Sequence, residues 1–188
     1  MRWILRSLAI AVAGFVLATT APPVQAQQTM TAAQQASLTT AIAANDAATI
    51  ASLAVKLSGP ALASLATYLV DSNNATLIAD VMANVKNLTD SPGTAFVGKA
   101  IGVAIANSPN AITLGPAVIT LTADNWAAVQ SIADGIITTS TNRAVVKAVQ
   151  YAAAQAGITL LAITLQSGGG IILGNAPPVP PPCTTSCT

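Results

Sequence analysis

The sequence predicts an all-α fold, a bundle or a short irregular α-solenoid of about seven to nine short helices. Forty of the 188 residues are alanine, the residue with the highest helix propensity. Apolar residues recur at three- and four-residue spacings, as on helices with one buried face. No segment has the sustained apolar–polar alternation of a half-buried strand. Since aromatic residues make up only 3% of the chain, the core is expected to be aliphatic.

Residues 1–26 have the features of a secretory signal peptide. A short basic leader with Arg2 and Arg6 precedes an apolar run over 7–17, which is too short to span a bilayer. Val24 and Ala26 place small residues at the −3 and −1 positions of a cleavage site. We therefore expect cleavage after Ala26 and export of the mature chain to the periplasm or the extracellular space.

Turn and capping residues divide the first half of the mature chain into five helices. Asn45-Asp46 separates the first helix from the second, and Ser58-Gly59-Pro60 ends the second and starts the third. The polar run 71–74 and Asp90 offer side-chain oxygens that can accept hydrogen bonds from first-turn N–H groups. The first, second, fourth and fifth of these helices are expected over residues 31–44, 47–57, 75–88 and 93–107.

The second half is expected to continue in the same way. Thr122 is the predicted N-cap of a helix over 124–137, with Trp126 as a core anchor. Ser140 or Thr141 is the predicted N-cap of a helix over 142–156. Two segments rich in Ile, Thr and Leu could be short helices or extended, and we assign helix to both. These segments are 111–121 and 157–166.

A loose internal repeat supports the prediction of an all-α fold. Residues 38–51, 65–78 and 101–114 each read as an apolar helix, a polar turn and a second apolar helix. The alanine-rich runs 100–109 and 148–157 resemble alanine-rich, exported helical-repeat proteins of Gram-negative bacteria, in which such helices are followed by Asn-Pro or Ser-Pro turns. The resemblance covers roughly residues 38–157, and it implies a helical domain, which we place at 27–166, without catalytic residues to carry over.

Residues 167–188 form a Gly- and Pro-rich tail. Pro177 to Pro182 favours an extended polyproline II stem, and Cys183 and Cys187 are spaced to close a small disulfide loop in an exported protein. The tail is either a spacer for presentation or crosslinking, or a disordered tail with an incidental disulfide. The uncharged segment 157–174 has two interpretations as well, a lipid-contacting helix or a buried terminal helix followed by a linker.

The composition excludes most common catalytic mechanisms. The chain has no His and no Glu, which excludes Ser-His-Asp and Cys-His catalysis and His-bearing zinc sites. The mature chain has five basic residues and six aspartates, so it has no basic patch for nucleic acid. Helix capping explains four of the aspartates, and a solvated helix face explains the other two. The four are Asp46, Asp71, Asp90 and Asp124, and the two are Asp80 and Asp134.

These observations favour a non-enzymatic role without a cofactor, a metal or nucleic acid. We expect an exported structural or protein-interaction module of the periplasm or cell surface, acting through a protein partner or self-association. The alternative is a secreted membrane-active or hydrophobic-surface-binding helical protein. It is motivated by the 53% hydrophobic content and by the absence of charge after Lys147. An aspartate-only hydrolase is the third and weakest reading.

Overall fold

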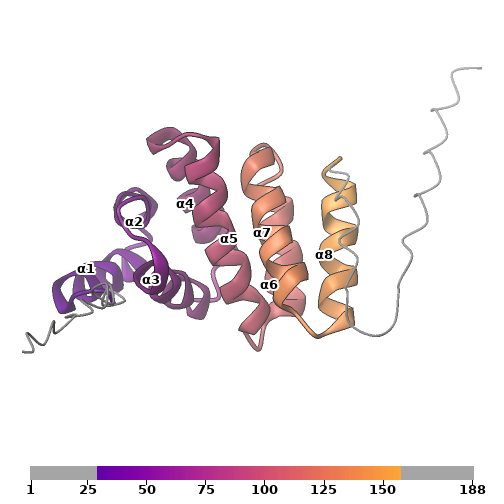
Figure 1. Ribbon diagram of the computed structural model, residues 1–188, viewed down its shortest axis with the longest axis horizontal. Coiled ribbons are helices and arrows are strands. Elements are labelled where there is room, and N and C mark those ends of the chain that lie inside the picture. Colours follow the sequence, from indigo (N-terminus) through magenta and orange to yellow (C-terminus); the bar gives the residue numbers. More distant parts are fainter. Residues whose placement is uncertain (1–28, 158–188) are drawn as a thin grey trace, which may run out of the picture.

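The computed structural model describes residues 29–157. This part of the chain folds into eight α-helices and has no strand, which confirms the all-α prediction. The helices follow one another along an elongated body (Figure 1). They are α1 (Ala32–Ala43), α2 (Ala47–Ala54), α3 (Gly59–Asp71), α4 (Ala75–Leu88), α5 (Ser91–Asn107), α6 (Ala111–Leu121), α7 (Trp126–Thr139) and α8 (Arg143–Gln155).

The helices form four consecutive hairpins in two layers. Each odd-numbered helix packs against the next odd-numbered helix, and each even-numbered helix packs against the next even-numbered one. Within the hairpins, α1 packs against α2, α5 against α6 and α7 against α8. Contacts that recur between neighbouring helix pairs are those of an α-solenoid, so the molecule is a short solenoid of the expected kind.

The turns inside the hairpins share one design. In all four, three residues separate the two helices, and the third is an aspartate or asparagine at the N-cap. Asn45 and Asn73 occupy the middle position with φ of 53° and 51°, a left-handed conformation that asparagine tolerates well. The Asn74 amide donates a hydrogen bond to Oδ1 of Asn45 at 3.0 Å, so the first two turns lie side by side. The four N-cap residues are Asp46, Asn74, Asn110 and Asn142.

Two of the predicted aspartate caps are confirmed. Asp46 accepts a hydrogen bond from the backbone N–H of Thr49 at 3.0 Å, and Asp90 accepts one from Gly93 at 2.9 Å. Asp71 and Asp124 are not caps, because Asn74 caps α4 and Asn125 caps α7. Asp71 is the last residue of α3, and Asp124 is exposed in the α6–α7 connection.

The predicted N-cap of α7 was wrong. The Thr122 hydroxyl donates to the carbonyl of Val118 at 2.7 Å and so ends α6. Asn125 caps α7 instead, accepting from the N–H of Ala128 at 3.3 Å. Its amide also donates to the carbonyl of Met82 at 3.2 Å, which ties the start of α7 to α4. The helix therefore begins two residues later than predicted.

The predicted N-cap of α8 was also wrong. Asn142 caps this helix by accepting from the N–H of Ala144 at 2.9 Å. Ser140 ends α7, and its hydroxyl accepts from the N–H of Asn142 at 3.2 Å. The two errors differ in cause. The Thr122 hydroxyl bonds backward to the preceding helix, whereas the Ser140 hydroxyl accepts from the N–H of Asn142, the residue that caps α8.

The core is aliphatic and follows most of the predicted stripes. Leu62, Leu65 and Leu69 of α3 are buried, as are Val129, Ile132 and Ile136 of α7. Trp126 was predicted in the same α7 stripe, but it is 62% exposed. It is the first residue of the helix, and helical side chains lean toward the N-terminus, so its ring projects beyond the helices that cover the rest of the stripe.

Glycines bring α5 and α7 into the closest contact in the odd-numbered layer. A Cβ atom on Gly102 would overlap the carbonyl oxygen of Ile132 and lie 3.0 Å from Cα of Gly135. A Cβ atom on Gly135 would lie 2.6 Å from the carbonyl oxygen of Lys99. One turn away, Gly98 faces Ser131. The two backbones approach to a distance that no side chain would allow.

Several sequence predictions fall outside the described residues. These are the signal peptide over 1–26, all but Gly157 of the helix predicted over 157–166, and the tail over 167–188 with Cys183 and Cys187. They stay predictions.

Candidate functional site

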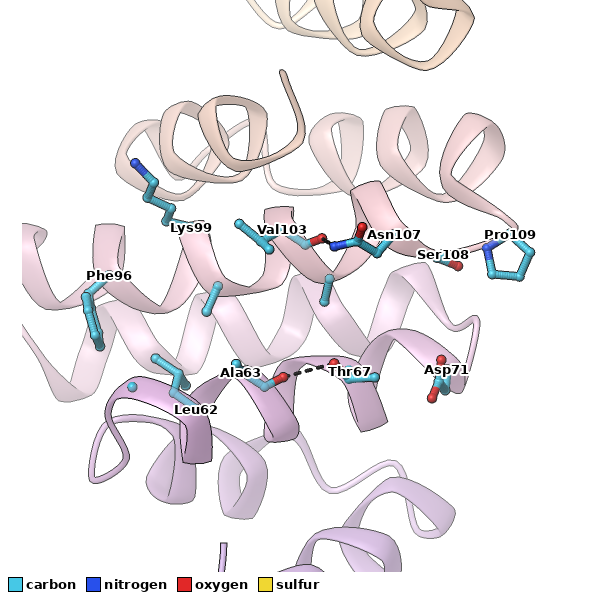
Figure 2. Close-up of a pocket in the computed structure, with 13 residues that line it drawn as sticks. Leu62, Ala63, Thr67, Asp71, Phe96, Lys99, Val103, Asn107, Ser108 and Pro109 are labelled. Carbon is cyan, nitrogen blue, oxygen red and sulfur yellow. Dashed lines mark hydrogen bonds between the residues drawn. The ribbon is translucent and has the colours of Figure 1, made fainter. Parts of the chain in front are cut away.

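A groove of about 530 Å³ opens between α3 and α5 (Figure 2). Both helices belong to the odd-numbered layer, and they leave a space that α5 and α7 do not leave. Phe96 stands at one end of the groove with 55% of its surface exposed. The apolar side chains that line the walls are Leu62, Ala63, Phe96, Ala100, Val103 and Ala104.

The two walls run in the same direction. Figure 2 shows Leu62 of α3 near the Phe96 end of α5, and Asp71 at the end where Ser108 and Pro109 lie. At 1.5 Å per residue, the 13-residue α3 provides a wall of about 20 Å. The groove therefore has a length suited to about three turns of a helix, with different chemistry at its two ends.

Polar side chains in the walls bond to their own helices. The Thr67 hydroxyl donates to the carbonyl of Ala63 at 3.0 Å, and the Asn107 amide donates to the carbonyl of Val103 at 2.9 Å (Figure 2). These bonds satisfy part of the polar capacity of both side chains within the wall. A partner therefore meets walls that are mostly apolar.

The charges of the groove are unevenly distributed. Asp71 lies at the end where α3 and α5 both finish, so its carboxylate adds to the partial negative charge of two helix C-termini. Lys99 lies on the rim, but its Nζ is 3.0 Å from Oδ2 of Asp134 on α7. This is the one ion pair among residues 29–157. The Asp71 end is therefore the negative end of the groove.

The aspartates do not converge on a reaction centre. Within residues 29–157, no group of three His, Cys, Asp or Glu side chains could hold a metal ion. Asp80 lies on an exposed face of α4, whereas Asp134 pairs with Lys99 in addition to being partly solvated. Hydrogen bonds from the hydroxyl and the backbone N–H of Thr49 lower the pKa of Asp46, as expected for a cap.

Sequence reasoning missed the groove, although α5 carries a signal for it. One apolar stripe of this helix, with Val97, Ile101 and Ile105, is buried. A second stripe starts at Phe96 and continues through Ala100, Val103 and Ala104, and it lines the groove. A helix that is apolar on more than one face has surface left over after the core is complete.

Comparison with known proteins adds no relative: no family model, no curated protein and no solved structure matches this chain. Among the helices formed by residues 29–157, none is both long enough and apolar enough to cross a membrane. The functional interpretation therefore depends on the geometry and chemistry of the groove.

Proposed function

We propose that this protein is an exported, non-enzymatic protein-interaction module of the periplasm or cell surface, and that the α3–α5 groove is its binding site. The groove itself carries the proposal: an open space of about 530 Å³ with apolar walls on one layer of a solenoid. Solenoids commonly bind partners along such extended surfaces. The leader over residues 1–26 supports the export part of the proposal.

The exposed phenyl ring supplies a reason for binding. Phe96 is 55% exposed although it sits beside apolar wall residues. Fully burying such a side chain is worth about 1.5–3 kcal/mol, so a partner that covers only its exposed part gains about half of that from this ring. Aromatic residues are frequent anchors of protein–protein interfaces. Phe96 is therefore the residue whose loss should weaken partner binding most.

The composition supports a role without catalysis. The chain contains neither His nor Glu, and the aspartates are spread over the turns and exposed faces of different helices. A general acid–base mechanism needs a titratable group with a suitable pKa close to the reacting atoms. In the proposal, the tail over residues 167–188, with Cys183 and Cys187, serves as a spacer or attachment point.

One observation favours the alternative, a protein that binds hydrophobic surfaces or membranes. Leu88, Leu121 and Trp126 are all more than half exposed, and all stand at helix ends on the connections between hairpins. Dye leakage from liposomes at sub-micromolar protein would favour this alternative. A stable soluble protein that causes no leakage would favour the groove.

Affinity capture with matched variants tests the proposed function. The purified mature protein, Phe96→Glu and Tyr151→Glu are used to retain proteins from an extract of expressing cells. Tyr151 is an exposed aromatic residue of α8 outside the groove, so it is the control. A partner retained by wild type and Tyr151→Glu but lost with Phe96→Glu supports the proposal. Equal retention by all three, or hydrolytic turnover in a broad substrate screen, contradicts it.

A further inference from the structure

We propose that the groove binds an amphipathic helix of a partner protein, antiparallel to α3 and α5, with a lysine or arginine in its first turn next to Asp71. This inference rests on the proposed function and specifies the chemistry of the partner. It is carried by the size of the groove, the nature of its walls and the position of Asp71.

The size of the groove fits one face of a short helix. Truncating one buried leucine to alanine can leave a cavity of about 150 Å³, so 530 Å³ takes roughly three aliphatic side chains of that size. Apolar residues at positions i, i+4, i+7 and i+11 of a helix span about 16 Å. The groove is about 20 Å long, so three or four such residues can be placed along it.

The walls favour a helix over an extended peptide. A bound strand needs an exposed sheet edge to satisfy its backbone hydrogen bonds. Here both walls are helices, whose interior N–H and C=O groups already bond within the helix. An occupant that meets apolar side chains on both sides must satisfy its own backbone, and a helix does so.

The charge of Asp71 sets the direction of the bound helix. Its carboxylate makes no ion pair with any residue in 29–157, and it lies beside the carbonyl ends of α3 and α5. A cation is favoured there, and so is the N-terminus of a helix, which carries a partial positive charge. The first turn of the partner helix therefore lies near Asp71, and the helix runs opposite to both walls.

Lys99 does not cancel this preference. Its ammonium group is held by Asp134 on the α7 side, at 3.0 Å, and Figure 2 shows the side chain extending away from the α3 wall. Asp71 is therefore available to a cation of the partner, since it pairs with none of residues 29–157, whereas Lys99 is already paired with Asp134.

A peptide binding experiment with exchanged charges tests the inference. The probe is a fluorescently labelled helical peptide with leucines at i, i+4, i+7 and i+11 on an Ala/Gln background and a lysine in its first turn. The matched peptide has glutamate in place of that lysine. Kd values are measured by fluorescence anisotropy with the full mature chain and with Asp71→Lys, Phe96→Glu and Tyr151→Glu. Circular dichroism checks that each variant is folded.

We expect the lysine peptide to bind wild type about ten-fold more tightly than the glutamate peptide, since one attraction is replaced by one repulsion of similar size. Asp71→Lys should reverse the order of the two peptides. Phe96→Glu should weaken the lysine peptide at least about ten-fold, because a leucine site is lost and a charge is buried. Tyr151→Glu should leave both Kd values unchanged.

The unfavourable outcomes separate the two proposals. Equal Kd values for the two peptides, both raised by Phe96→Glu, would overturn the cationic helix and leave the groove as a binding site. Binding of both peptides that Phe96→Glu does not change would contradict the groove itself. Two results would assign the groove to another occupant and overturn the inference. A wild-type dimer that Phe96→Glu abolishes would assign it to a second copy of the chain. Proteolytic cleavage after residue 157 that Phe96→Glu accelerates, with wild type binding neither peptide, would assign it to the chain's own C-terminal residues.

Discussion

The two contacts that α5 makes within the odd-numbered layer differ in kind. On the α7 side, Gly102 lets the α5 backbone meet that of α7 at Gly135, and the contact leaves no room for an added Cβ atom. On the α3 side, Phe96, Ala100 and Val103 line a groove of about 530 Å³. One helix thus closes one side of the layer and leaves the other open. The difference shows that side-chain size on each face of α5 decides how closely each neighbouring helix approaches.

This contrast assigns the two sides different roles. A close-packed contact resists deformation, because small displacements bring atoms into overlap. An open groove with apolar walls can be filled by a partner without disturbing the core. In this molecule the closed α5–α7 side supports the open α3–α5 side, and substitutions on the two sides should behave differently.

Truncation of a buried aliphatic residue on each side should give the largest effects. Ile132→Ala, on the closed side, should lower the free energy of unfolding by about 3–4 kcal/mol, because its cavity has no access to existing space. Leu62→Ala, in the groove wall, should cost about 1 kcal/mol less, because its cavity joins the groove. Urea denaturation followed by circular dichroism measures both. Equal losses would mean that the groove is not open in solution.

Adding a single methyl group tests the closed contact directly. Gly102→Ala should lower the free energy of unfolding by about 2 kcal/mol despite the better helix propensity of alanine, because the methyl group meets the carbonyl oxygen of Ile132. Ala63→Leu, at an exposed position of the groove wall, is the control and should change stability by less than about 0.5 kcal/mol. Thermal denaturation compares them, and a more stable Gly102→Ala protein would contradict the close approach.

The start of α7 should depend on Asn125 more than a typical helix depends on its cap. Asn125→Ala should cost about 2 kcal/mol, because the substitution removes the cap and also leaves the buried carbonyl of Met82 without this donor. Asp90→Ala removes an exposed cap at α5 and should cost about 1 kcal/mol. Urea midpoints measure the difference. If the two variants were equally stable, the bond to Met82 would contribute nothing.

The elements with strong local signals could be predicted from the sequence. The apolar stripes, the polar turn at Asn45-Asp46 and the cap at Asp90 each depend on residues within one or two helical turns. The predicted N-caps Thr122 and Ser140 were wrong, because several adjacent polar residues could serve as the cap. At α7 a tertiary bond from Asn125 to Met82 selects one of them, and at α8 the bond between Asn142 and Ser140 is local. The prediction that Trp126 lies in the core was wrong as a consequence, since its position at the start of the helix leaves it exposed.

The groove could not be predicted, because it depends on the distance between helices far apart in sequence. Gly98 and Gly102 of α5 stand four residues apart, a spacing that permits close helix approach. That spacing identifies a face for contact, but it does not identify α7 as the partner or α3 as the helix left at a distance. Both assignments come from the order in which the hairpins stack.

The ion pair between Lys99 and Asp134 should make the smallest contribution to the contrast. The side chains of Lys99 and Asp134 are 57% and 33% exposed, so solvent screens their attraction. A double-mutant cycle with Lys99→Met and Asp134→Asn should therefore give a coupling free energy of about 0.5 kcal/mol at low salt. The coupling should fall further in 1 M NaCl, where the screening length is about 3 Å. A coupling above about 2 kcal/mol that salt does not reduce would show that the pair, rather than the glycines, holds α5 against α7. The closed side would then owe its geometry to charge, and Gly102→Ala should cost little.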